Sequence, residues 1–181
     1  MAYPFASALL WTVALASISA QTQVNAPPNA EETLRYVNAA KPSMYTSSRG
    51  AGGDLTPLMV SSDRTQFLLH HDDGGSTLDG QVDIRELDPT AVSVVHYDAF
   101  NDIVRVGCSQ KKICYTEIGR IPGMTPSFDR SDNFNVWITP DGDKADRVAR
   151  ALRHLVELLQ AEYKSSHTSP VDPNDPFAKP Q

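Results

Sequence analysis

The chain is poor in the features that mark several common classes of protein. Its 181 residues include only 2 cysteines and 8% aromatic residues, and its formal net charge is -6 at pH 7. An acidic balance offers no electrostatic footprint for nucleic acid, which favours a basic surface. Beyond the first 20 residues no long apolar run occurs, so we expect a mature chain without a transmembrane span. These shortages favour a globular domain that binds no nucleic acid.

The short motifs of the commonest catalytic and cofactor sites are also missing. The sequence contains no G-x-S-x-G nucleophile elbow, no G-x-x-x-x-G-K-[ST] phosphate loop and no C-x-x-C pair. Two acidic, glycine-bearing stretches, 72–80 and 140–146, do not fit the calcium loop of an EF-hand. We therefore predict a noncatalytic protein with no cofactor and no metal.

The N-terminal segment has the composition of a secretory signal peptide. It contains no Asp, Glu, Lys or Arg, and its apolar part, from about residue 6 to residue 18, is shorter than a membrane span needs. Small residues follow, and cleavage is expected after Ala20, with Ala16 as a second candidate. Since no Lys or Arg precedes the apolar part, an uncleaved N-terminal anchor is the alternative. We predict an exported protein, periplasmic or secreted, in which residues 1–20 are the signal peptide.

The 2 cysteines, Cys108 and Cys114, are expected to form a disulfide, because exported proteins meet an oxidising environment. The segments on either side of them have the pattern of strands, and the residues between them are typical of a turn. We interpret the region as a hairpin that places the two cysteines opposite each other, at a cross-strand spacing that suits a disulfide.

Periodicity divides the rest of the chain into recognisable parts. After a linker at 21–29, residues 30–41 have helical composition, and the glycine-rich stretch 42–57 is typical of a loop. From residue 58 the apolar period becomes two, and short strands recur every 8–15 residues. Residues 143–163 form the clearest helix, with an apolar stripe along one side. Four prolines and few apolar residues predict a disordered tail at 164–181.

This order predicts an α+β fold for residues 30–163, taken as one domain. We expect an antiparallel β-sandwich or partly open barrel of about seven strands. The C-terminal amphipathic helix closes its open side, and a short helix precedes the strands.

The order of strands followed by one amphipathic helix resembles that of pleckstrin-homology-like domains. The segments VDIRELDPTAVSVV and DKADRVARALRHLVELL, together with the cysteine pair, also resemble small exported bacterial proteins of unknown function. The resemblance covers roughly residues 30–163 and implies a fold and a binding role. Lipid-binding members carry a first inter-strand loop rich in Lys and Arg, whereas this chain offers only Arg64 there, which argues against inositol-lipid binding.

One polar cluster is a candidate binding site, because four polar residues follow one another at the end of an apolar run: His70, His71, Asp72 and Asp73. Neighbouring residues in a strand point to opposite faces, so the two histidines cannot easily hold one ion together. A mixed site that combines His71 with His96 and an aspartate is the alternative. We interpret the cluster as the solvated end of a strand that opens into a turn.

Three hypotheses for function follow. The first is a noncatalytic exported binding domain or envelope-associated accessory domain, with an envelope protein as the expected partner. The second is a metal-dependent or hydrolytic enzyme that uses His70, His71 and His96 with nearby aspartates. The third is a structural subunit that docks through its N-terminal helix or its Pro-rich tail. The residue pattern favours the first and does not name a ligand.

Overall fold

The computed structural model describes residues 26–41, 44–46, 52–72, 74–97, 99, 102–138, 141 and 143–167. The predicted signal peptide, most of the linker, Asp73 and the tail beyond His167 lie outside this range. Helix α1 (Ala30–Ala40) comes first and helix α2 (Lys144–His167) last. Between them lie strands β1 (Met44–Thr46), β2 (Gly52–Leu55), β3 (Met59–Val60), β4 (Gln66–Asp72), β5 (Thr77–Asp83), β6 (Leu87–His96), β7 (Asp102–Cys108), β8 (Tyr115–Arg120), β9 (Ser127–Ser131) and β10 (Asn133–Ile138).

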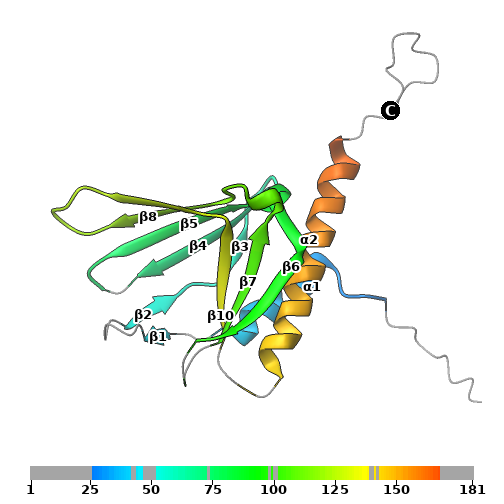
Figure 1. Ribbon diagram of the computed structural model, residues 1–181, viewed down its shortest axis with the longest axis horizontal. Coiled ribbons are helices and arrows are strands. Elements are labelled where there is room, and N and C mark those ends of the chain that lie inside the picture. Colours follow the sequence, from blue (N-terminus) through cyan, green and yellow to red (C-terminus); the bar gives the residue numbers. More distant parts are fainter. Residues whose placement is uncertain are drawn as a thin grey trace, which may run out of the picture.

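The described strands form two antiparallel sheets. The larger has seven strands in the order β1-β2-β4-β5-β8-β9, with β3 paired to β4, and the smaller has three in the order β10-β7-β6. Figure 1 shows β4, β5 and β8 running away from α2, while β6, β7 and β10 lie on the side of the helices. This confirms an α+β sandwich-like fold, and its sheets do not close into a barrel.

The two sheets meet at a corner that the chain crosses three times. One crossing runs from β5 to β6 through a short 3-10 helix, Ile84–Glu86, and another runs from β9 to β10 through Asp132 alone. The third runs from β7 to β8 through the disulfide loop. Backbone bonds tie these crossings together, since Cys108 N donates to Asp132 O at 2.8 Å and Asp83 N donates to Cys114 O at 2.9 Å. The result is one antiparallel meander folded sharply across its middle.

The predicted disulfide between Cys108 and Cys114 is confirmed, with a Cα–Cα distance of 5.8 Å. The hairpin that was predicted around it is wrong. Strand β7 pairs with β6 and β10, whereas β8 pairs with β5 and β9 in the other sheet. The disulfide therefore closes the loop by which the chain passes from one sheet to the other, not a turn between paired strands. Both are buried, so the disulfide is part of the core beneath the bend.

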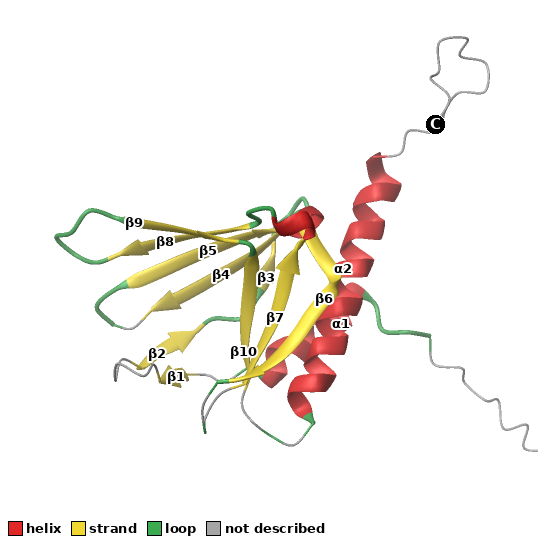
Figure 2. Cartoon of the chain, viewed as in Figure 1, coloured by secondary structure: helices red, strands yellow, loops and turns green. Residues whose placement is uncertain are grey.

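The helices cover one face of the smaller sheet. Figure 2 shows them together on one side of β6, and the fold brings α2 into contact with α1, β6 and β7. Helix α1 begins with a capping box, in which Asn29 accepts from Glu32 N and the Glu32 carboxylate accepts from Asn29 N. The apolar stripe of α2 is buried at helical spacing: Ala145, Val148, Leu152, Leu155, Val156 and Leu159. Their burial holds the helix on the sheet, because apolar area removed from water stabilises by about 25 cal/mol per Å².

Two predicted boundaries change. Helix α2 continues to His167, so residues 164–167, which were assigned to the tail, are helical. The glycine-rich stretch 42–57 was predicted as a loop, yet β1 and β2 pair within it. No helix of the described ranges is long and apolar enough to cross a membrane. The disulfide is compatible with an exported protein.

We expect Leu155→Ala to lower the free energy of unfolding by about 2–5 kcal/mol, since this side chain is completely buried and the change leaves a cavity. Arg150→Ala, on the exposed face of the same helix, is the control and should change stability by less than about 0.5 kcal/mol. Urea unfolding followed by circular dichroism measures both. Equal effects would contradict the packing of α2 described above.

We also expect thiol titration of the unreduced, denatured protein to find no free cysteine. Replacing Cys108 and Cys114 together by serine should cost about 2 kcal/mol, since the disulfide closes a short loop. Urea unfolding of the double variant measures this cost. Two reactive thiols in the untreated protein would refute the disulfide.

Candidate functional site

A cleft lies on the inner side of the bend. It has a volume of about 320 Å³ and lies between the larger sheet and β10, the edge strand of the smaller sheet. Its apolar lining comes from Leu69, Leu78, Tyr115, Val136 and Trp137. Its polar lining includes Lys41, His71, Glu117 and Asn135. A cleft of this size with mainly apolar walls and a few polar groups is typical of small-molecule sites.

The register of the larger sheet decides which side chains form the floor of this cleft. Leu69 of β4 pairs with Gly80 of β5, which pairs with Glu117 of β8. Residues paired across strands point to the same face, so this row and its alternating neighbours lie on one side. Toward the corner that face is the core, with Phe67 stacked on Phe134 at a centroid distance of 5.7 Å. The cleft begins where this packing ends.

Tyr115 and Glu117 form a fixed polar pair on the floor. They stand two residues apart on β8, and the Tyr115 hydroxyl donates to Glu117 Oε2 at 2.5 Å. The Tyr115 ring lies over Gly80, where an added Cβ would approach the ring to 2.9 Å. Burial and the hydrogen bond to Glu117 raise the pKa of Tyr115, so the phenol keeps its proton. The Tyr115 hydroxyl therefore remains a hydrogen-bond donor to Glu117 on the floor of the cleft.

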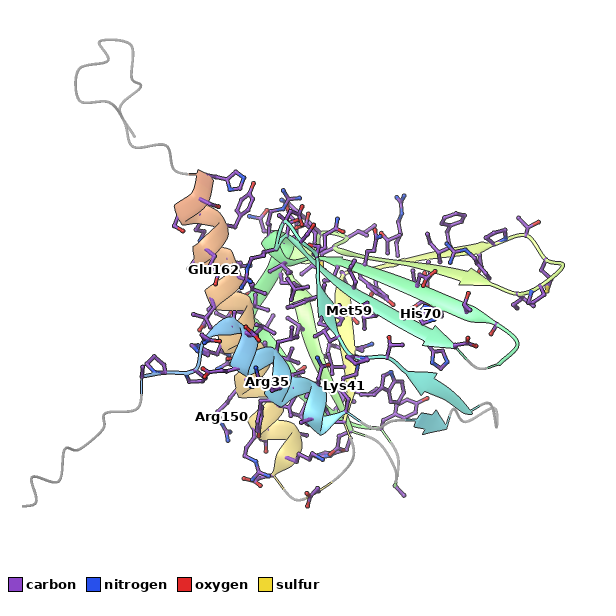
Figure 3. The ribbon with its side chains drawn as sticks, turned by 180° about the vertical axis from the view of Figure 1, so that it is seen from behind. Arg35, Lys41, Met59, His70, Arg150 and Glu162 are labelled. Atoms are coloured by element: carbon purple, nitrogen blue, oxygen red, sulfur yellow. A yellow bond between two sulfur atoms is a disulfide. The ribbon has the colours of Figure 1, made fainter. Side chains whose placement is uncertain are left out.

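Lys41 supplies the positive charge of the cleft. It follows the last turn of α1, and its Nζ donates to Thr56 O at 2.8 Å (Figure 3). The end of α1 is itself anchored, because the Asn38 side chain bonds both Leu58 N and Leu58 O, at 2.7 and 2.9 Å. Burial lowers the pKa of Lys41 to about 8. Among the described residues no carboxylate forms an ion pair with this ammonium group.

The opposite wall is aromatic. Trp137 of β10 meets Tyr97 edge to face, with ring centroids 5.1 Å apart. An edge-to-face pair of this kind fixes the orientation of both rings and stabilises by roughly 0.5–1.5 kcal/mol. The indole thus gives the cleft a rigid apolar side opposite the sheet.

The structure separates the histidines that the sequence placed side by side. Neighbouring residues of β4 point to opposite faces, as predicted, and although both His70 and His71 line the cleft, it is His71 that pairs across the sheet with the cleft residue Leu78. The His70 ring is hydrogen-bonded to Asp79 at 2.7 Å on the outer face, where Asp79 also pairs with Arg120. The bonds from His70 and then Arg120 hold the pKa of Asp79 below its usual range. Asp79 therefore stays charged and serves an exposed ion-pair network.

Two other residues of the predicted cluster, Asp72 and His96, bond to residues other than the histidines. Asp72 caps a turn by accepting from Gly74 N at 2.7 Å, and Asp73 lies outside the described residues. His96 ends β6 in the smaller sheet, where it contacts the buried Asp102 at 2.8 Å. Within the described ranges no three His, Cys, Asp or Glu side chains are grouped so as to hold a metal ion.

Of the residues that line the cleft, His70 and His71 were singled out from the sequence, and the others were not. Tyr115 and Glu117 carry one usable signal, since residues two apart on a strand share a face. The alternation in NFNVWI similarly separates Trp137 from the buried Val136 and Ile138. Lys41 carries no such signal, because its place depends on how α1 packs against Leu58.

Comparison with protein-family models, with curated proteins and with solved structures finds no match to this chain. The cleft is therefore the feature from which a function is inferred.

The lowered pKa of Lys41 predicts a pH dependence of stability. Between pH 8 and the usual lysine value of 10.5, the folded protein has released this proton while the unfolded chain still binds it. The contribution of Lys41 to the free energy of unfolding therefore rises with pH in that window. His71, Tyr115 and Glu117 face the same cleft, so the effect is read as a difference between variants.

The measurement is urea unfolding from pH 7 to pH 10 of the native chain and of Lys41→Met. In Lys41→Met the free energy of unfolding should no longer rise with pH in this window. In Lys112→Met, at an exposed lysine paired with Glu86, the rise should remain. Parallel curves for the native chain and Lys41→Met would contradict the burial of this amine.

Proposed function

We propose that this protein is a noncatalytic exported binding domain whose ligand site is the cleft between the larger sheet and β10. The observation that carries the proposal is the composition of the cleft. Apolar walls from both sheets surround two opposite charges, on Lys41 and Glu117, that do not neutralise each other. Such a site suits a small amphipathic molecule, because the walls bury its apolar body and the charges orient it.

The fixed geometry of the cleft supports a binding role. The Tyr115 ring rests on Gly80, and the backbone of α1 is tied to Leu58 by the Asn38 side chain. A site that is formed before the ligand arrives loses less entropy on binding. The relationship to pleckstrin-homology-like domains stays a proposal at the level of fold, supported by the strands-then-helix order. Export is likewise proposed, from the N-terminal segment and the disulfide.

The test uses anilinonaphthalene sulfonate, a fluorescent probe with an aromatic body and one negative charge. We expect saturable binding to the full chain, and its loss in Leu78→Trp, which fills the cleft. Ile118→Trp is the matched control, because Ile118 lines a separate hollow on the outer face of the same sheet. It should bind the probe like the native chain.

Two results would overturn the proposal. One is the absence of saturable binding to the native chain. The other is loss of binding in Ile118→Trp with retention in Leu78→Trp, which would place the site on the outer face.

A further inference from the structure

The two charges of the cleft lie at opposite sides of its floor. The Lys41 ammonium sits at Thr56 O, and Thr56 runs beside β4, since its hydroxyl and its N–H both donate to His70 O, at 2.8 and 3.4 Å. Glu117 stands on β8, which is separated from β4 by β5. Thr56 and β8 are three strand spacings of about 4.8 Å apart, and the Lys41 and Glu117 side chains reach inward from both sides, so the charges are separated by on the order of 10 Å.

Both groups also keep hydrogen-bonding capacity that no other described residue uses. An ammonium group has three donors, of which Lys41 uses one on Thr56 O. A carboxylate has two acceptor oxygens, and Glu117 uses Oε2 for the Tyr115 hydroxyl. No ion pair joins Lys41 to Glu117, although both lie among the described residues and line one cleft. A ligand with an anion at one end and a cation at the other is the complement of this arrangement.

The apolar lining lies between these two ends. Leu69 and Leu78 come from the sheet, and Trp137 stands on the opposite wall. An extended peptide advances about 3.3 Å per residue, so three residues span roughly 10 Å between their terminal charges. A free amino acid is too short to reach both groups, and a long peptide exceeds a volume of about 320 Å³.

We propose that the ligand is a short peptide of about three residues with both termini free. Its C-terminal carboxylate pairs with Lys41 and its N-terminal ammonium pairs with Glu117. Its central apolar side chain packs against Leu69 and Leu78. This inference rests on the proposed function, because it names the class of ligand for the same cleft.

The test is calorimetric titration of the full chain with the tripeptide alanyl-leucyl-alanine. The free tripeptide is compared with its N-acetylated form, its C-amidated form and the dipeptide leucyl-alanine. Each blocked terminus removes one charge-assisted contact, worth about 1.5–3 kcal/mol, so each should weaken binding by about tenfold or more. The dipeptide should also bind at least about tenfold more weakly, because it cannot reach both ends.

Variants assign each terminus to its partner. In Lys41→Met the free and amidated peptides should bind equally, while acetylation still weakens binding. In Glu117→Gln, which keeps an acceptor for Tyr115, the free and acetylated peptides should bind equally. Lys112→Met is the control for Lys41→Met and should leave every ratio unchanged, because Lys112 pairs with Glu86 away from the cleft.

The outcomes separate this inference from the proposed function. If anilinonaphthalene sulfonate binds in the cleft but the tripeptide does not bind, or binds as well with its termini blocked, the peptide assignment is refuted and the cleft remains a ligand site. If neither the probe nor any peptide binds, both proposals fail together.

Discussion

The fold depends on how the strands pass from one sheet to the other. At the corner, β5, β7 and β9 each continue into a strand of the other sheet, and the disulfide between Cys108 and Cys114 fixes the middle crossing. The bend turns apolar faces of both sheets toward one another and produces a core around Phe67 and Phe134. Helix α2 lies beside the smaller sheet (Figure 2), and its buried side chains belong to the same core. Farther from the corner the larger sheet diverges, and the cleft is the space that the core does not fill.

The bend also determines which charged side chains can form ion pairs. On the outer surface, charged side chains form exposed ion pairs with each other, as Asp79 does with Arg120. In the cleft, Lys41 and Glu117 belong to elements that the bend holds apart, and no ion pair joins them. Each is hydrogen-bonded, Lys41 to Thr56 O and Glu117 to the Tyr115 hydroxyl, and partly buried ionisable groups in a cleft are typical of binding sites. Because of this contrast we propose the cleft, rather than the histidine cluster, as the ligand site.

The sequence predicted features that depend on local periodicity. The buried stripe of α2 and the opposed faces of His70 and His71 follow from spacing along one element, and the two cysteines pair because they are only 6 residues apart in the chain. Features that depend on which strands become neighbours were not predicted. The cysteine hairpin was wrong because β7 and β8 enter different sheets, a choice made by distant pairing. Tyr115 meets Gly80, and Lys41 reaches the cleft, for the same non-local reason.

The most direct measurement asks whether the floor and wall of the cleft face each other. A bimane label at Leu78→Cys or at Ile118→Cys, in a Trp11→Phe background, reports contact with Trp137, the sole remaining tryptophan. The account predicts strong quenching from position 78, which shares the cleft with Trp137, and little from position 118 on the opposite face. Equal quenching at both positions, or quenching at position 118 alone, would contradict it.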